Sequence, residues 1–300
     1  MFKLALTIFF LFSFSNIVLS QNGESFDLRW KLNEGETLFY KSSLQKIDTS
    51  ETKKQKIEIG AFFGFLPDSI MDKSKVFFER FNSLYDDAEL FSILEKKKNN
   101  NVSISIFVEN SLLQQVEGNS SQDFRELVSN FNQGVVLRGS VTEEGEIASF
   151  YLKQEQRNLI SLMFELPPHS VKVGDSWALD VNFLMFDQNF VCDSSERKNS
   201  ITFAHVRRMN SDTIAILNYD IHESAKGVFY TPFASDGIPT SMEMSYRGIA
   251  EFSITSGRWL SYNCLSKMEA SGVMNTSSIQ RTYLAPIQDL PKTIKTKLNK

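Results

Sequence analysis

The feature that most constrains the fold is a strict alternation of apolar and polar side chains, which is clearest in the second half of the chain. Apolar residues occupy every second position of one stretch, at Trp177, Leu179, Val181, Phe183 and Met185. Successive side chains of a β-strand point to opposite faces, so this pattern predicts a strand with one buried face. A chain built mainly from such stretches folds into sheets rather than into a helical bundle.

Turn sequences separate the alternating stretches, as expected for antiparallel hairpins. The second half is predicted to contain two hairpins, 201–207 with 213–222 around Asn210-Ser211-Asp212, and 242–254 with 259–267 around Thr255-Ser256-Gly257. The first half is predicted to contain strands at 26–32, 38–44 and 102–108, and a hairpin over 135–152 around Glu143-Glu144-Gly145. Residues 223–240, rich in Gly, Pro and Ser, predict a long loop that carries Phe229, Tyr230 and Phe233.

Three stretches have the spacing of helices instead. The clearest is 71–96, in which apolar residues recur at alternating steps of four and three, at Phe77, Phe81, Leu84, Ala88 and Phe91. Residues 123–131 and 154–164 are shorter candidates. Together these patterns predict an α+β fold dominated by strands, in which curved antiparallel sheets, built as a meander of hairpins, pack against a few helices.

The first twenty residues have the layout of a secretory signal. Lys3 precedes an apolar run from Leu4 to Phe14, and the small residues Val18 and Ser20 suit the positions before a signal peptidase cut, expected after Ser20. An uncleaved membrane anchor is the alternative, because the apolar segment is nearly as long as the about 20 residues that span a bilayer.

Without the signal, residues 21–300 are predicted to form a single β-rich domain, or two similar halves, 21–165 and 166–288, with a short C-terminal tail. This mature chain is expected to be periplasmic or secreted and to have no stable membrane span. The net charge of −4 and the lack of a basic patch argue against nucleic acid as a partner. The only cysteines, Cys192 and Cys264, are a candidate disulfide in an oxidising compartment, and two buried thiols are the alternative.

Several motifs resemble those of an uncharacterised family of exported bacterial proteins, known only as a domain of unknown function. Leu166-Pro167 is followed, after a spacer, by Val171-Lys172-Val173-Gly174-Asp175-Ser176-Trp177, which is similar to the family's LP...VKVGDSW signature. The run Leu28-Arg29-Trp30-Lys31-Leu32-Asn33-Glu34-Gly35-Glu36 resembles the strand and turn that open its mature part, and Gly248-Ile249-Ala250-Glu251-Phe252 with Ser256-Gly257-Arg258 matches a later strand and turn more loosely. The resemblance implies export and a β-rich fold and carries over no catalytic residue. Residues 70–100 depart from the family's pattern.

No catalytic, cofactor or metal-binding motif stands out in the sequence, which lacks a Gly-x-Ser-x-Gly elbow, a His-Glu-x-x-His pair, a P-loop and a dinucleotide glycine fingerprint. His169 lies in a Pro-bounded loop, while His205 and His222 lie on the two arms of one predicted hairpin. A hairpin centred on Ser211 places Leu217 opposite His205, so His222 lies about 17 Å further along, at about 3.3 Å per residue, and cannot share a metal with it. Two acidic clusters are typical of solvated surface rather than of calcium sites: Asp86-Asp87-Glu89 and Glu143-Glu144-Glu146.

These observations predict a non-enzymatic protein of the periplasm or cell envelope, with neither cofactor nor metal. Curved sheets that cover helices can present a concave apolar face, so a hydrophobic ligand or an envelope protein is the expected partner. The alternative is a structural or protein-interaction component without a ligand pocket, which would have a filled interior and an exposed apolar patch. A hydrolase built from scattered Asp, Ser and His residues is a third hypothesis, for which the sequence offers no recognisable constellation.

Overall fold

The computed structural model describes residues 23–47, 89–97, 100–109, 135–149, 154–184, 188–230, 236–273 and 275–298. In chain order the elements of these residues are β1 (Ser25–Phe26), β2 (Thr37–Lys46), β3 (Glu89–Lys96), β4 (Val102–Glu109), β5 (Val135–Val141), α6 (Gln154–Phe164), β6 (Val171–Lys172), β7 (Ser176–Trp177), β8 (Phe190–Met209), β9 (Asp212–Phe229), β10 (Ile238–Ser253), β11 (Arg258–Ser271), β12 (Thr276–Ile287) and α7 (Lys292–Leu298). The predicted α+β fold dominated by antiparallel strands is confirmed.

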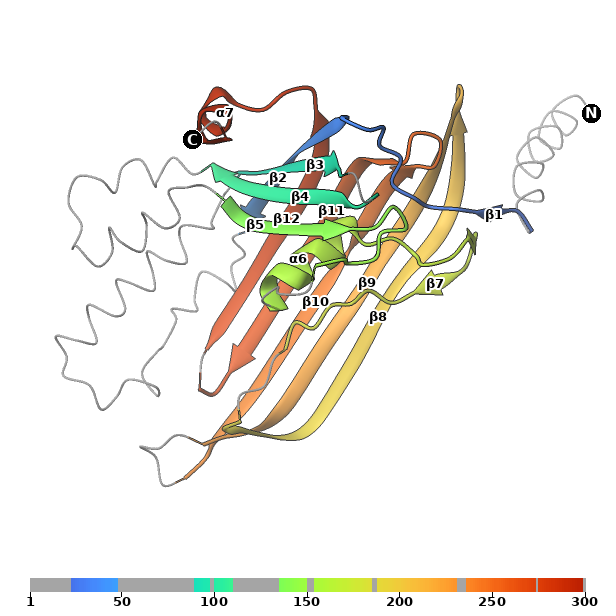
Figure 1. The fold of residues 1–300 in the computed structure, drawn as a ribbon. Coiled ribbons are helices and arrows are strands. Elements are labelled where there is room, and N and C mark those ends of the chain that lie inside the picture. Colours follow the sequence, from blue (N-terminus) through green and yellow to red (C-terminus); the bar gives the residue numbers. More distant parts are fainter. Residues whose placement is uncertain are drawn as a thin grey trace, which may run out of the picture.

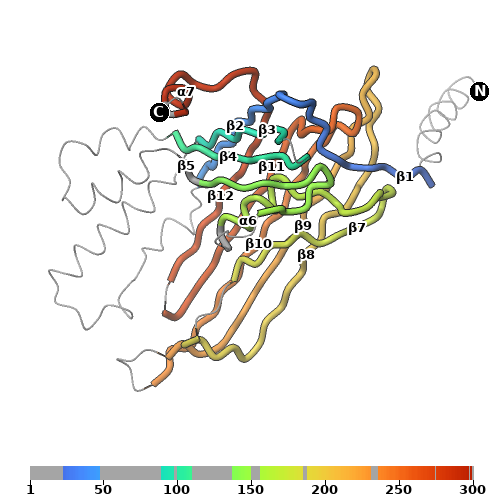
Figure 2. Tube along the Cα trace, in the orientation of Figure 1, coloured from blue at the N-terminus to red at the C-terminus, as the bar shows by residue number. Residues whose placement is uncertain are grey.

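Ten of the strands form one antiparallel sheet in the order β5-β4-β3-β2-β12-β11-β10-β9-β8-β7, and β1 pairs with β6 in a separate two-stranded sheet. β2 joins the early strands to the late ones, because it pairs with β3 on one side and with β12 on the other. Figure 1 shows α6 lying against one face of the sheet, which we call the inner face. Figure 2 shows that β3 to β5 run across the direction of β8 to β12, so the sheet curls around α6.

The inner face holds the main core, which also caps α6. The last carbonyl groups of a helix have no partner inside the helix. Three fully buried aromatic side chains supply the missing donors here: the Trp30 indole N–H donates to Phe164 O at 3.0 Å, the Trp259 indole N–H to Met163 O at 2.6 Å, and the Tyr262 hydroxyl to Leu162 O at 3.1 Å. The rings of Trp30, Trp259 and Tyr262 also pack edge to face, so one cluster both buries apolar area and ends the helix.

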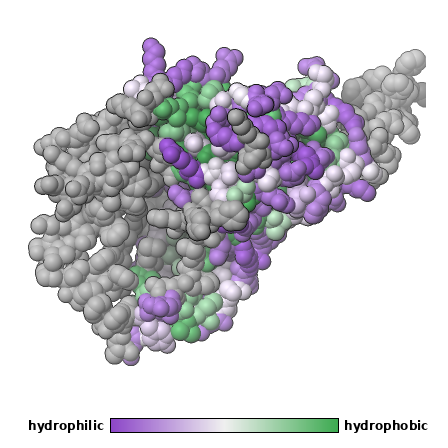
Figure 3. All heavy atoms as spheres, in the orientation of Figure 1, coloured by the Kyte–Doolittle hydropathy of each residue, from purple (hydrophilic) through white to green (hydrophobic). Residues whose placement is uncertain are grey.

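A second, smaller core lies on the opposite, outer face of the sheet. Leu290 and Ile294, from α7 and the turn before it, pack against Phe91 of β3 and Phe107 of β4. Figure 3 shows hydrophobic surface beside α7 at the top of the view. α7 was not predicted from the sequence, which indicated only a short C-terminal tail.

The predicted helix over 71–96 is wrong where the structure describes it, because Glu89–Lys96 is strand β3. Leu90 and Leu94 belong to the inner core, whereas Phe91 and Ile93 belong to the outer one. A strand covered on both faces has no polar side to alternate with, so its apolar residues imitate helical spacing. Residues 71–88 lie outside the described part of the chain.

Two alternating stretches are extended but contribute little to the ladders. The predicted strands at 26–32 and 177–185 are wrong in length, because β1 ends at Phe26 and β7 ends at Trp177. The burial pattern nevertheless alternates, with Leu28, Trp30 and Leu32 buried in the first stretch. The backbone of these stretches bonds to side chains and to single carbonyls, such as Trp30 N–H to Glu143 O at 2.8 Å.

The predicted loop at 223–240 is also wrong, since β9 runs to Phe229 and β10 begins at Ile238. Gly227 marks a close approach of strands rather than a turn, because a Cβ there would lie 2.1 Å from Val191 O. The helix at 154–164 and the hairpins around 210–212 and 255–257 are confirmed. In the hairpin at 135–152, the first arm is β5 and the described part of the second makes one bridge, Val141 with Ile147. The predicted signal, its cleavage after Ser20 and the helix at 123–131 lie outside the described residues.

Candidate binding site

The inner face of the sheet continues well beyond α6, and methionine and alanine side chains replace the aromatic cluster there. α6 has 11 residues, or roughly 16 Å at 1.5 Å per residue, whereas β9 has 18 residues, or roughly 59 Å at about 3.3 Å per residue. In the part that α6 does not cover, Met244 pairs with Met268 across β10 and β11, and Met242 lies between Ala225 and Ala270. We call Met242, Met244, Met268, Ala225 and Ala270 the methionine face. Its three methionines are half-buried, so this end of the inner face is apolar and partly accessible.

A cluster of tyrosines separates the methionine face from α6. Tyr246 lies two residues from Met244 on the same face, and its hydroxyl is 2.7 Å from that of Tyr262. Tyr219 packs edge to face on Tyr262, with ring centroids 5.1 Å apart. Burial raises the pKa of all three tyrosines well above the ordinary value. The hydroxyl groups next to the methionine face are therefore neutral, and they bind each other and the end of α6.

An extended segment, residues 179–184, crosses from α6 to the sheet beside this face, and we call it the strap. Two asparagines each bind both backbone groups of one strap residue, as a neighbouring strand would: Asn199 binds Leu179 N–H at 3.1 Å and O at 2.7 Å, and Asn158 binds Asn182 N–H at 2.8 Å and O at 2.7 Å. At Asp180, the backbone N–H donates to Glu165 at 3.0 Å and the carbonyl accepts from the Ser161 hydroxyl at 3.0 Å. Side chains thus satisfy the backbone of a segment that has no strand partner.

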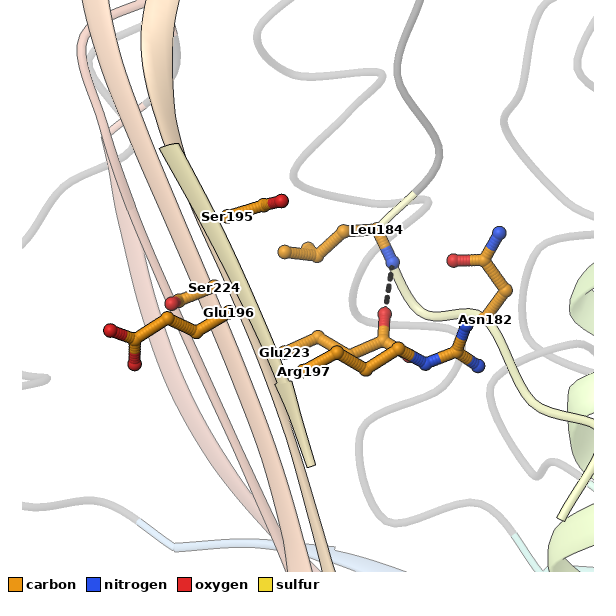
Figure 4. Close-up of a pocket in the computed structure, with 7 residues that line it drawn as sticks. All are labelled: Asn182, Leu184, Ser195, Glu196, Arg197, Glu223 and Ser224. Carbon is orange, nitrogen blue, oxygen red and sulfur yellow. Dashed lines mark hydrogen bonds and ion pairs between the residues drawn. The ribbon is translucent and has the colours of Figure 1, made fainter. Parts of the chain in front are cut away.

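Glu223 holds the lower end of the strap. Its Oε2 accepts hydrogen bonds from the backbone N–H groups of Phe183 at 2.8 Å and Leu184 at 2.9 Å, and its Oε1 lies 3.2 Å from Arg197 Nε. Arg197 also donates to a carbonyl of the strap. Figure 4 shows these side chains between the sheet and the strap, with Leu184 and Ser195 facing each other across the gap. The pocket that they line has a volume of about 410 Å³.

The Glu223 carboxylate serves as a clamp rather than as a proton donor or acceptor for a ligand. Only 4% of the residue is exposed, and Oε1 is buried with no hydrogen bond beyond the ion pair with Arg197. Two amide donors and a guanidinium offset the charge, as a buried carboxylate requires. Phe183, held by this clamp, packs against Tyr246 with ring centroids 6.4 Å apart. The strap therefore forms one wall of the methionine end of the inner face.

The two cysteines are both free in the structure, so the candidate disulfide between Cys192 and Cys264 is not formed. Cys192 is exposed at the start of β8 and lies opposite Gly227, whereas Cys264 is buried in β11, opposite Gly248. Gly248 in turn pairs with Tyr219, eight positions from Gly227 on β9, which is roughly 26 Å at about 3.3 Å per residue. A disulfide spans only about 6 Å between Cα atoms.

The structure keeps the histidines apart, as the sequence predicts, although the register differs by one residue. Ile216 rather than Leu217 lies opposite His205, because the ladder closes with Met209 opposite Asp212, which centres the hairpin between Asn210 and Ser211 rather than on Ser211. His222 pairs with Lys198 in the ladder and lies 3.9 Å from a carboxylate oxygen of Glu243. His169 is exposed in its loop.

Three of the four described residues of the acidic clusters form ion pairs, and the fourth, Glu146, is exposed. Glu89 pairs with Lys41, Glu143 with Lys96, and Glu144 with Arg29. Asp86 and Asp87 lie outside the described residues. Within the described ranges, no three His, Cys, Asp or Glu residues gather as a metal site would require. No helix in those ranges has both the length and the apolar character needed to cross a membrane.

No model of a known protein family matches the chain, and no curated protein matches it.

The methionine face and the strap were not predicted as a site. The signal for the first was present, because Met242, Met244 and Met268 lie in two segments predicted to pair as a hairpin. What the sequence does not show is where the helix at 154–164 lies on the sheet, and therefore which part of the inner face it leaves without a covering helix. The strap was predicted as a strand, and its side-chain partners come from α6, β8 and β9, far away in the sequence.

Proposed function

We propose that this chain is an exported, non-enzymatic protein of the periplasm or cell envelope that binds a hydrophobic ligand on the methionine face. The observation that carries the proposal is the half-buried row of Met242, Met244 and Met268 beyond the end of α6. Methionine is flexible and polarisable, and it is over-represented on surfaces that bind varied apolar partners. An acyl chain or a similar apolar group matches such a face.

The polar groups around the face favour binding over catalysis. The neighbouring tyrosines, Tyr246 and Tyr262, are neutral and bonded to each other. Glu223 is bonded to the strap and paired with Arg197. A general acid or base needs a proton that can reach a substrate, and these groups are engaged in holding the structure.

The proposed export rests on the sequence. Residues 1–20 have the order of a cleavable signal, with Lys3 before the apolar run and Ser20 before the expected cut. The resemblance to an exported family, carried by the run from Val171 to Trp177, points the same way. Detection of a mature N-terminus at Gln21 in the periplasmic fraction would support the proposal, and an intact chain in the cytosol would contradict it.

Native mass spectrometry of the protein recovered from its own cells tests the ligand. We expect added mass that denaturation releases as a lipid or another apolar compound. Met268→Glu places a charge on the methionine face and should weaken binding of a fluorescent fatty acid by about tenfold or more. Val191→Glu is the matched control, because Val191 is an exposed apolar residue of β8 that lies outside the methionine face. Equal binding by the two variants, or a consistently bare wild-type protein, would contradict the proposal.

A second candidate is a structural or interaction component of the envelope that has no ligand pocket. Exposed apolar side chains on the outer face, Ile249, Leu265 and Tyr283, favour it. The two candidates differ in which face of the sheet binds the partner, so Leu265→Glu on the outer face and Met268→Glu on the methionine face separate them. Loss of binding to the cell envelope in Leu265→Glu, together with unchanged envelope binding in Met268→Glu, would support the second candidate.

A further inference from the structure

The outer face carries a compact apolar patch that α7 does not cover. Ile249 and Tyr283 lie on either side of Asn263 in the ladder, and Leu265 is two residues from Asn263 on the same face. We call Ile249, Leu265 and Tyr283 the outer patch. Their exposed fractions are 54%, 41% and 44%. Three of the seven large apolar side chains that are exposed among the described residues therefore meet at one place, which chance scatter does not explain.

Cations flank this patch. Arg247 and Arg281 lie directly opposite Leu265 on its two sides, on β10 and β12. Arg247 pairs with Asp220 at 2.9 Å and keeps 66% of its side chain exposed. Arg281 is exposed and forms no ion pair with any residue that the structure describes. The outer patch is thus apolar in the middle and flanked by two arginines, while the acidic residues Asp220 and Glu251 beside it are each paired with an arginine, in a chain whose net charge is −4.

The size and charge of the outer patch indicate which kind of partner it can bind. A stable protein–protein interface buries about 800 Å² on each side, far more than three half-exposed side chains provide. A lipid surface needs only shallow insertion of a few apolar groups together with cations near anionic head groups. Tyrosine also suits the head-group region, because its ring is apolar and its hydroxyl is polar.

We propose that the outer patch docks the protein on an anionic lipid surface, with Ile249, Leu265 and Tyr283 inserted among the head groups and with Arg247 and Arg281 on lipid phosphates. This inference goes beyond the proposed ligand binding, because it concerns the opposite face of the sheet. It explains why apolar side chains remain exposed between two exposed arginines. The methionine face stays free to hold its own ligand.

Flotation with phosphatidylcholine vesicles, with and without phosphatidylglycerol, tests the docking. We expect the processed chain to bind the anionic vesicles and to be released by high salt. Ile249→Glu should lower the bound fraction by about tenfold, since it removes an inserted side chain and adds a repelled charge. Arg281→Gln should lower it by a few-fold. All variants have the same N-terminus, so a difference in the vesicle-bound fraction between them comes from the substituted side chain.

Val191→Glu is the matched control, because Val191 is as exposed as Ile249, at 54%, but lies on β8, away from the patch. It should bind as the wild type does. Circular dichroism checks that each variant is folded. We expect all of them to fold, because the substituted side chains lie on the surface. Equal loss in Ile249→Glu and Val191→Glu, or wild-type binding that is the same on neutral and anionic vesicles, would overturn the proposal.

Discussion

Replacing Trp259 with phenylalanine tests the role of the aromatic cluster as the cap of α6. Trp259 is fully buried, and its indole N–H is the donor to Met163 O at 2.6 Å. The smaller ring cannot donate, so a buried carbonyl is left without a partner, which costs about 1–3 kcal/mol. It also leaves roughly 40 Å³ unfilled, which adds about 1 kcal/mol at about 24 cal/mol per Å³. We expect Trp259→Phe to lower the free energy of unfolding by about 2–4 kcal/mol.

Urea unfolding followed by circular dichroism measures this loss as a shift of the midpoint at an unchanged slope. Trp177→Phe is the matched control, because Trp177 is half-buried and its indole N–H is buried without a hydrogen-bond partner among the described residues. Removing an unpaired donor relieves a penalty, so this variant should be close to the wild type. If the two substitutions destabilise equally, ring volume alone matters and the capping explanation is refuted.

Three further predictions concern buried groups. Native protein treated with iodoacetamide should be alkylated at Cys192 only, because burial removes Cys264 from solvent and raises its pKa to about 12; mass spectrometry that finds a disulfide or a modified Cys264 would contradict this. Burial raises the pKa of Glu165, so the folded state holds that proton more tightly than the unfolded chain does, and stability should fall as pH rises above the ordinary value of 4.5. The urea unfolding midpoint of Glu165→Gln should decrease less than that of the wild type as pH rises through this range. Gly248→Ala should destabilise by about 1–3 kcal/mol, because its Cβ would lie 2.2 Å from Asn263 O and 2.4 Å from Cys264 Sγ; a thermal midpoint equal to that of the wild type would show that the sheet can widen there.

The parts of the fold that were predictable from the sequence are those in which a single local signal decides the structure. The helix at 154–164 combines helical spacing with the stop at Pro167, and the hairpin turn at 255–257 contains Gly257, whose φ of 62° is the left-handed conformation that favours glycine. Each of these features depends on neighbours within a few residues. Local sequence therefore carries enough information to place them.

The errors arise where distant contacts decide. The sequence of β3 has the apolar spacing of a helix because Phe91 and Ile93 face an outer core. That core is completed by α7, some two hundred residues later in the chain. The strap reads as a strand because its burial alternates, but its backbone partners are side chains such as Asn158 and Asn199. A single sequence shows which side chains are apolar, but it does not show which element covers them. The burial of both faces of β3 and the position of the methionine face could therefore not be predicted from local sequence.

The position of β12 between β2 and β11 has a consequence for the synthesis of the protein. Until residues 276–287 emerge, β2 and β11 each have an unpaired edge, and the early and late strands remain two separate pieces. A chain truncated before Thr276 would keep both edges open, which invites pairing with other chains. The ten-stranded sheet can therefore be completed only after the last strand of the chain has been made.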